Sequence, residues 1–320
     1  MQNELDKIMA NPLVSVIIPT YNRTDVVGNA IDSVLQQTYK KIEIIVVDDG
    51  STDNTQDKLA QYRNVIKVVR QVNAGPAAAR NRGVEVSRGE ILAFLDSDDL
   101  WLPTKIERQV DAMQKTDKSV PCCLCNAIIH APNGEERTSF DLACLKASYK
   151  EGIWKNVAQV LSTRCVFFTQ ALAVRREAFL RVGGFDDSLP VMEDHDLALR
   201  LSLAGPWVYI KEPLVIYHAD RPDGLAYQAR KEKIQFQKAM VRLYSKSLSN
   251  SANTCHKTRR QLEHKLKIAR RRLRLVHECG GRAIYASVLR NLLRFERLKM
   301  AVYHRLPWFR KMDDSPLDEP

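Results

Sequence analysis

A run of five apolar residues, Ile91 to Leu95, is followed directly by three carboxylates within four residues, Asp96, Asp98 and Asp99. The apolar run predicts a buried strand, so the three acids stand together where that strand ends. Like charges held close together repel and raise each other's pKa unless a cation neutralises them. Oxygen ligands without a thiolate suit Mg²⁺ or Mn²⁺, and Mg²⁺ typically joins one or two carboxylates to substrate phosphates. The segment therefore indicates a divalent metal that holds a diphosphate; the alternative is a solvated acidic loop or helix cap.

Strands and helices alternate through residues 12–115. Apolar segments predict strands over residues 14–18, 42–47, 65–69 and 91–95. Helices are predicted after Thr24, over 53–62 and over 76–87. A fourth helix is predicted to have Pro103 at its first position. Because the strands are apolar throughout, the pattern indicates an α/β fold with a mostly parallel central sheet flanked by helices. We expect the first strand to end at Pro19 and Thr24 to cap the next helix.

Polar segments follow three of these strands, at residues 19–22, 48–49 and 96–99. In open α/β sheets, ligands bind beyond the carboxyl ends of the strands. Three strands would therefore deliver polar side chains to one edge of the sheet. This convergence favours a binding site at that edge over three unrelated turns.

Residues 116–220 are less regular. Strands are predicted over 120–130, 171–174, 207–210 and 214–218, and a short helix over 177–182. Residues 131–165 show no clear pattern, and acceptor-facing loops are one interpretation of them. Glu193, Asp194 and Asp196 precede an apolar helical stripe, which places them in the first turn of a helix. The helix dipole favours acids at that position, so the residues alone leave these three as capping groups at least as readily as functional ones.

The charge is spread unevenly along the chain. The formal net charge of +11 combines −4 over residues 1–220, +19 over 221–312 and −4 over the tail 313–320. Residues 221–312 also show apolar residues at helical spacing among arginines and lysines, first at Leu262, Leu266, Leu273 and Val276 and then at Val288, Leu292, Phe295 and Val302. We interpret 221–312 as a basic amphipathic helical extension that contacts an anionic membrane surface; the alternative is a helical lid packed on the body. No nucleic-acid-binding module accompanies the charge, so nucleic acid is not an expected partner.

The seven cysteines form no regular framework, and their odd number argues against a disulfide scaffold. Reduced thiols fit a cytosolic setting, and Cys122, Cys123 and Cys125 are expected to be buried in a strand rather than bound to zinc. The polar N-terminal segment has no signal-peptide core, and no apolar run is long enough to span a membrane. We expect a cytoplasmic protein, peripheral on the cytoplasmic face of the membrane.

Several motifs occur together in the order and spacing of a known family. They are residues 16–23 (Val-Ile-Ile-Pro-Thr-Tyr-Asn-Arg), 46–53 (Val-Val-Asp-Asp-Gly-Ser-Thr-Asp), 73–83 (Asn-x-Gly and Ala-Arg-Asn-x-Gly) and 95–99 (Leu-Asp-Ser-Asp-Asp). Gly183 to Asp186 and the pair Glu193-Asp194 extend the match. Over about residues 12–220 the chain closely resembles bacterial-type family 2 glycosyltransferases of the GT-A fold. The resemblance implies a Rossmann-like nucleotide-sugar-binding half, 12–115, and an acceptor and catalytic half, 116–220.

The resemblance implies a metal-dependent, inverting transferase that uses a nucleotide-diphospho-sugar, with a UDP-sugar favoured. Carried over position by position, the turn of Pro19, Thr20, Tyr21 and Asn22 and the carboxylate of Asp49 would surround the base. Arg80 would contact the base or the diphosphate, and Asp96 would lie near the ribose.

The same resemblance assigns the metal and the catalytic base. Asp98 would coordinate Mn²⁺ or Mg²⁺, while Asp96 and Asp99 would stand beside it as further metal ligands or supports. Asp194 matches the general base, with Glu193 next to it. Many relatives carry Arg-x-His after the last core strand; here the segment is Tyr-His-Ala-Asp, so His218 or Asp220, or neither, completes the metal shell.

The resemblance therefore implies transfer of a sugar to a hydroxyl of a glycan or lipid-linked acceptor, in cell-surface polysaccharide or lipopolysaccharide assembly. The alternative is a non-catalytic sugar-nucleotide-binding protein whose basic tail binds a partner; the intact acidic set disfavours it. A nicotinamide dehydrogenase would need Gly-x-Gly-x-x-Gly after the first strand, and a nucleotidyltransferase a glycine-rich phosphate loop there. Residues 19–22 provide neither.

Overall fold

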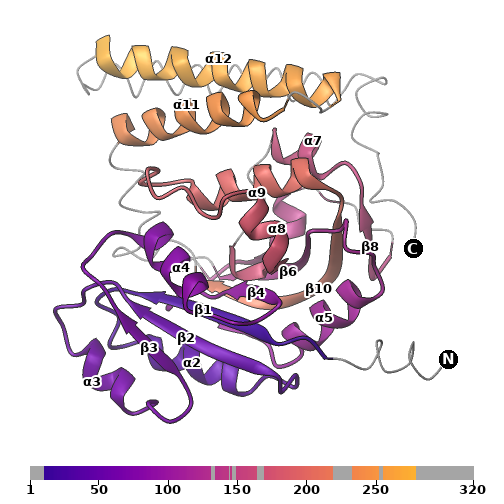
Figure 1. Ribbon diagram of the computed structural model, residues 1–320. Coiled ribbons are helices and arrows are strands. Elements are labelled where there is room, and N and C mark those ends of the chain that lie inside the picture. The colour runs from indigo at the N-terminus through magenta and orange to yellow at the C-terminus, as the bar shows by residue number, and fades with distance from the viewer. Residues whose placement is uncertain are drawn as a thin grey trace.

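The predicted fold class is confirmed by the computed structural model, which describes residues 11–130, 134–143, 145, 149–163, 169–218, 233–251 and 255–278. Ten strands of these described residues form one sheet with helices on both faces (Figure 1). Along its main path the strand order is β3-β2-β1-β4-β9-β6-β10-β5.

The first half of the sheet is parallel. It contains β1 (Val14–Thr20), β2 (Ile42–Asp48), β3 (Lys67–Arg70) and β4 (Ile91–Phe94). The helices α2 (Val27–Leu35), α3 (Thr55–Ala60) and α4 (Pro76–Glu85) connect these strands. Two local expectations are wrong. β1 continues through Pro19, which pairs with Val47. Thr24 does not cap α2; its hydroxyl donates to Asp53 Oδ2 at 2.7 Å instead.

The second half of the sheet is mixed, so parallel pairing dominates only the first half. β9 (Leu172–Arg175) is antiparallel to both β4 and β6 (Cys122–His130), whereas β10 (Trp207–His218) is parallel to β6. The strands predicted over 207–210 and 214–218 are one strand, β10, interrupted by an irregularity around Pro213. Cys122, Cys123 and Cys125 are buried free thiols in β6, as expected.

The remaining elements of this half cover or extend the sheet. They are β5 (Leu100–Trp101), α5 (Lys105–Gln114), β7 (Glu136–Thr138), α6 (Ser139–Leu142), β8 (Glu151–Trp154), α7 (Val157–Leu161), a 3-10 helix (Thr169–Ala171), α8 (Arg176–Arg181) and α9 (Glu193–Ala204). α5 begins at Lys105 rather than at Pro103, with Thr104 as its N-cap residue. Four elements, β7, α6, β8 and α7, lie within 131–165, where the sequence had no clear periodicity.

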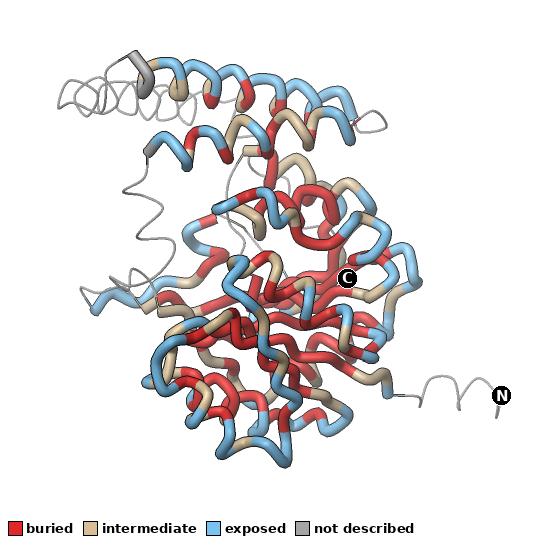
Figure 2. Tube along the Cα trace, turned by 60° about the vertical axis from the view of Figure 1, so that its left-hand side comes forward, coloured by how far each residue is buried: buried red, intermediate tan, exposed pale blue. Residues whose placement is uncertain are grey.

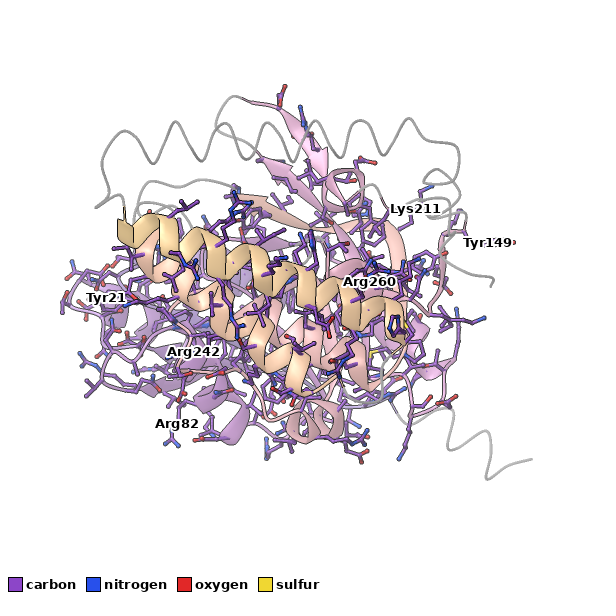
Figure 3. All side chains as sticks on the ribbon, turned by 90° about the horizontal axis from the view of Figure 1, so that it is seen from above. Tyr21, Arg82, Tyr149, Lys211, Arg242 and Arg260 are labelled. Carbon is purple, nitrogen blue, oxygen red and sulfur yellow. The ribbon has the colours of Figure 1, made fainter. Side chains whose placement is uncertain are left out.

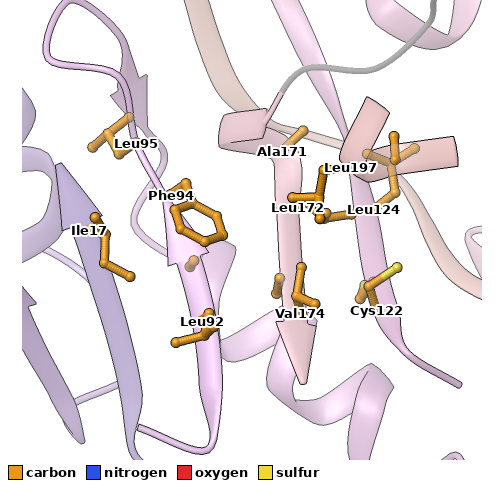
Figure 4. Packing of buried hydrophobic residues seen from close by; sticks show 14 of the residues in the cluster. Ile17, Leu92, Phe94, Leu95, Cys122, Leu124, Ala171, Leu172, Val174 and Leu197 are labelled. Carbon is orange, nitrogen blue, oxygen red and sulfur yellow. The ribbon is translucent and has the colours of Figure 1, made fainter. Parts of the chain in front are cut away.

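The core is continuous across β1, β4, β9 and β6 (Figure 4). Phe94 of β4 packs edge to face against Phe185, with ring centroids 5.1 Å apart. Gly83 lets α4 approach β1, because a Cβ at that position would lie 2.4 Å from Cγ2 of Ile17. β4 is thus a central strand, and the acidic turn at its carboxyl end lies in the middle of the sheet edge.

The C-terminal extension includes two described helices, α11 (Lys233–Ser249) and α12 (His256–Glu278), which pack against each other. α11 also contacts α9, and α12 contacts α7. Leu243, Leu262 and Leu266 are buried members of the core, and Figure 2 shows exposed residues along the outer side of the pair. The described apolar face therefore packs on the body, as the lid alternative proposed.

Other expectations for the extension concern residues that the structure does not describe. The side chain of Val276, the residues 279–312 with their second apolar stripe, and Asp220 lie outside the described residues. Among the helices that are described, none is both long and apolar enough to cross a membrane.

Candidate active site

The predicted polar turns meet at one edge of the sheet because β2, β1 and β4 are parallel neighbours. The turns after β1 and β2 are bonded directly to each other. The amide of Asn22 donates to Ser51 Oγ at 2.9 Å, and the Oδ1 of Asn22 accepts from the amide of Thr52 at 2.8 Å. These bonds hold Asn22 in a left-handed backbone conformation with φ of 52°. The role of Asn22 in the structure is thus to join the two turns.

The residues around Asn22 present both buried and exposed groups. Pro19 and Thr20 are buried, and the hydroxyl of Thr20 has no hydrogen-bond partner. Tyr21 is 43% exposed, which leaves its ring free to contact a flat ligand, and it lies at the margin of the molecule in Figure 3.

Asp49 orders the loop that leads into α4. Its Oδ1 accepts from Gln71 Nε2 at 2.8 Å and from the amide of Ala74 at 2.9 Å, while its Oδ2 accepts from the amide of Gly75 at 2.8 Å. Both carboxylate oxygens are therefore directed at this loop. The contact of Asp49 with a base edge stays a prediction.

Arg80 joins two acidic segments that are far apart in the sequence. Its Nη1 donates to Glu193 Oε1 at 2.9 Å, and its Nη2 donates to Asp96 Oδ1 at 2.6 Å. The guanidinium is buried, and it lies over the ring of Phe185 at 5.3 Å. Burial alone would lower the pKa of Arg80, but the charges of Asp96 and Glu193 hold it above its ordinary value. Arg80 thereby connects the turn after β4 to the first turn of α9.

Asp194 lies in that first turn, where the sequence placed it, and is partly buried. Burial and then the charge of Glu193 raise the pKa of Asp194 to about 7, although the amide of His195 and the charge of Arg80 act in the opposite direction. A carboxylate with a pKa near neutrality can accept a proton from a hydroxyl group at physiological pH. Its Oδ1 accepts from the amide of His195 at 2.6 Å, so it also satisfies a helix amide.

Asp99 is buried, and both of its oxygens accept hydrogen bonds. Gln170 donates to Oδ2, and the amide of His218 donates to Oδ1 at 2.9 Å. Burial, followed by the charges of Asp96 and Asp98, raises the pKa of Asp99 well above its usual value. This geometry assigns Asp99 to holding the end of β10 beside the acidic turn. The sequence did not reveal Gln170, because its partner is 71 residues away and no local motif marks it.

His218 stands at the end of β10 with its ring oriented by the acidic turn. Its Nδ1 lies 2.8 Å from the carbonyl oxygen of Asp98. A carbonyl oxygen can only accept, so Nδ1 carries a proton, and a neutral ring in this orientation has its lone pair on Nε2. Metal-binding histidines commonly use one ring nitrogen in this way while the other binds the ion.

The side chains at this edge offer a divalent cation only part of a coordination shell. Within the described residues, no three His, Cys, Asp or Glu side chains are grouped so that they could hold a metal by themselves. Asp96 and Asp98 are partly exposed carboxylates on one turn. Mg²⁺ usually takes one or two carboxylates and completes its shell with substrate phosphates and water. The residues present fit a metal that binds together with a diphosphate.

The family model described as Glycosyl transferase family 2 matches residues 15–183 of the chain. This range includes the turns after β1, β2 and β4 and Arg80; Glu193, Asp194 and His218 lie beyond it. The curated relatives matched first are longer than the match, and the chain spans 35–58% of their length.

Three similar proteins illustrate the likeness. The chain is 43% identical over 104 residues to the Escherichia coli UDP-Glc:alpha-D-GlcNAc-diphosphoundecaprenol beta-1,3-glucosyltransferase WfaP. This alignment covers 32% of this chain and 41% of WfaP. The solved structure of S. aureus TarS 1-349 in complex with UDP-GlcNAc has a TM-score of 0.63 at 19% identity. The alignment covers 79% of this chain and 70% of the TarS chain.

The third is the mannosyltransferase PcManGT from Pyrobaculum calidifontis in complex with GDP-Man and Mn²⁺. Its TM-score is 0.58 at 21% identity, and the alignment covers 96% of this chain and 84% of that one. At these identities the two solved structures establish the fold of the chain and nothing more.

We predict that Glu193→Gln lowers the pKa of Asp194 from about 7. Removing the neighbouring negative charge favours ionisation, and a charge at this range is worth about one pKa unit or more. The measurement is a pH titration followed by ¹³C NMR of the aspartate carboxyl carbons, with the resonance assigned by its loss in Asp194→Asn. Glu177→Gln, on the exposed surface of α8, is the control. An unchanged pKa in Glu193→Gln would show that Glu193 does not act on Asp194.

Proposed function

Since the chain belongs to glycosyl transferase family 2, we propose that it moves a sugar from a nucleotide-diphospho-sugar to a hydroxyl of a glycan or lipid-linked acceptor. The observation that carries the proposal is the link made by Arg80 between the acidic turn at Asp96 and the helix turn that bears Asp194. Sugar transfer needs one group to stabilise the leaving diphosphate and another to accept the proton of the acceptor. The link supports the proposal, because Arg80 and Asp96 are candidates for the first task and Asp194, next to Glu193, is the candidate for the second.

On the donor side, Asp98 and Asp96 are the proposed ligands of Mn²⁺ or Mg²⁺. The metal would supply charge stabilisation for the nucleoside diphosphate that departs. The base would lie between Tyr21 and the loop ordered by Asp49. A UDP-sugar is the favoured donor, supported by the UDP-Glc in the name of WfaP and the UDP-GlcNAc bound to TarS. The Mn²⁺ in the PcManGT complex supports a metal requirement.

His218 is proposed as a further metal ligand that would act only together with a bound diphosphate, since within the described residues no three His, Cys, Asp or Glu side chains are grouped to hold an ion by themselves. Support comes from its ring, which shares its proton with the Asp98 carbonyl and leaves the Nε2 lone pair available. Asp99 is better suited to holding this histidine in place than to binding the metal, because its oxygens are already engaged.

On the acceptor side, Asp194 is the proposed general base. It would take the proton from the acceptor hydroxyl as the oxygen attacks the anomeric carbon from the face opposite the leaving diphosphate, which inverts that centre. Glu193 assists by raising the proton affinity of Asp194 and by binding Arg80. A base with a pKa of about 7 loses activity as the pH falls below that value, because its carboxylate becomes protonated.

A role in cell-surface polysaccharide or lipopolysaccharide assembly on the cytoplasmic face of the membrane follows from the acceptor class. The lipid-linked acceptor in the name of WfaP supports this role. The membrane contact that we propose is the outward face of α12, which carries the exposed basic residues Lys257, Arg260, Lys267, Arg271 and Arg274.

This face, which we call the α12 basic stripe, belongs to a helix that lies toward the viewer in the view from above, where its Arg260 is labelled (Figure 3). The apolar side of α12 is covered by the body, so the contact would be electrostatic and would not insert. Each lysine or arginine near an anionic bilayer is worth about 1 kcal/mol, and salt screens the attraction.

The alternative function is a protein that binds sugar nucleotides without turnover. Both functions predict donor binding, so turnover with an acceptor separates them.

We predict that a UDP-sugar with Mn²⁺ or Mg²⁺ raises the melting temperature of the protein and that Asp98→Ala loses the metal-dependent part of this shift. At a concentration of about 100 Kd, a ligand stabilises the folded state by about 2.7 kcal/mol. GDP-, dTDP- and CMP-sugars are compared in the same screen, and Asp57→Ala, on the exposed side of α3, is the matched control. A metal-dependent shift that survives in Asp98→Ala would remove Asp98 from the metal site.

We predict that Asp194→Asn lowers kcat by about 10²–10⁴-fold and leaves donor affinity unchanged, because the amide cannot accept the proton. Turnover is measured by the release of nucleoside diphosphate in the presence of acceptor, and donor affinity by calorimetry. Asp187→Asn changes a nearby exposed carboxylate and should behave like the wild type. Near-normal turnover in Asp194→Asn would reject the base assignment.

We predict that the triple variant Arg260→Glu, Lys267→Glu and Arg271→Glu releases the protein from vesicles that contain anionic lipid. The control is Arg63→Glu, Lys118→Glu and Arg181→Glu, which changes the net charge equally on exposed sites of the body. Cosedimentation is measured at low and high salt, with turnover on a water-soluble acceptor retained in both variants. Equal release of the two variants would mean that net charge, and not the α12 basic stripe, governs binding.

A further inference from the structure

The extension is attached to the body next to the proposed base. α11 lies directly over α9 (Figure 1), and its Leu243 and Tyr244 are buried in the core. The family match ends at residue 183, so α11 lies outside it. Arg242 and Lys246 are four residues apart on α11, which places both on one face of the helix.

Lys246 reaches two carboxylates that flank the start of α9. Its Nζ lies 2.6 Å from Asp186 Oδ2 and 3.4 Å from Asp196 Oδ2. Asp186 is in the segment before α9, and Asp196 is in the first turn, two residues after Asp194. Asp196 is fully buried and also accepts from Arg200 Nε at 2.8 Å. Lys246 therefore bridges the segment before α9 to the helix itself.

Arg242 makes a second tie to the same segment, since its Nη1 donates to the carbonyl oxygen of Ser188 at 2.6 Å. The first turn of α9 is held from another element as well, by the bond from Arg80 of α4 to Glu193. Asp194 therefore lies between Glu193, which is bound by α4, and Asp196, which is bound by α11.

The start of α9 lacks a cap of its own. Its N-cap residue, Met192, has a left-handed backbone with φ of 68° and makes no side-chain capping bond. A left-handed backbone is unfavourable for a residue with a side chain and persists only where surrounding contacts enforce it. The ties from α4 and α11 supply such contacts, because they fix the residues on both sides of Met192.

We propose that Lys246 is a positioning residue, which holds the first turn of α9 and thereby the carboxylate of Asp194 in its reacting position. The C-terminal extension thus completes the catalytic half of the molecule rather than only covering it. This inference rests on the proposed function of Asp194. Its physical basis is that a base displaced by about 1 Å can lose up to about 10²-fold in rate.

The test compares Lys246→Met with Lys246→Arg in the full chain. Lys246→Met removes the bridge and keeps the aliphatic stem, and we expect kcat to fall about tenfold while the KM for the donor changes less than twofold. Lys246→Arg keeps the charge and should recover most of the loss. Lys238→Met, an exposed lysine of the same helix, is the matched control and should behave like the wild type.

Hydrogen exchange supplies a readout that does not depend on turnover. In Lys246→Met, the amides of residues 193–197 should exchange at least about tenfold faster than in the control, whereas those of α4 should not change. If the wild type transfers no sugar, the proposed function fails, and the exchange rates still decide whether Lys246 holds this turn.

Three results would overturn the proposal. One is a kcat and an exchange rate in Lys246→Met equal to those of Lys238→Met. Another is a parallel loss of kcat and donor affinity, which would indicate general damage. If Lys246→Met does not fold, Arg242→Met, which removes the more exposed tie, replaces it; unchanged exchange at 193–197 in that variant would also reject the proposal.

Discussion

The buried guanidinium of Arg80 is the interaction on which the candidate site depends. It forms ion pairs with Asp96, in the turn after β4, and with Glu193, in the first turn of α9, and it rests on the ring of Phe185. A buried charge is tolerated only when it is paired and hydrogen-bonded, so the position of Arg80 requires both acids to be in place. Gly83 contributes indirectly, because it lets α4 pack closely on β1 and so brings Arg80 to the edge of the sheet.

The same edge carries more negative than positive charge. Among the described residues, Asp96 and Glu193 bind Arg80 while Asp98, Asp99 and Asp194 stand beside these two acids, and burial with mutual repulsion raises the pKa of Asp99 and Asp194. Asp99 has a structural role, since it accepts hydrogen bonds from Gln170 and from the amide of His218 at the end of β10. Asp194 is a partly exposed group that can exchange a proton. A divalent cation at Asp96 and Asp98 would relieve the remaining repulsion.

The extension changes the way in which the basic charge of the chain is interpreted. The amphipathic pattern of residues 221–312 predicted a membrane-binding face, with a lid packed on the body as the alternative, and the described apolar residues of α12 pack on α7 and α11. Both interpretations used the same spacing, because burial against protein and burial in lipid demand the same apolar stripe. What distinguishes them is the presence of a complementary apolar surface on the body, and the part of that surface made by α7 comes from residues far away in the sequence.

The sequence by itself determined the strand–helix alternation, the central strand that ends in the acidic turn, and the meeting of three polar turns at one edge. These follow from local periodicity and from the rule that parallel strands end on the same side. Only the tertiary structure decided which side chains touch there. Arg80 and Glu193 are 113 residues apart, and Lys246 and Asp196 are 50 apart. No local pattern encodes such pairs, since their energy comes from burial and opposite charge that exist only once the chain has folded.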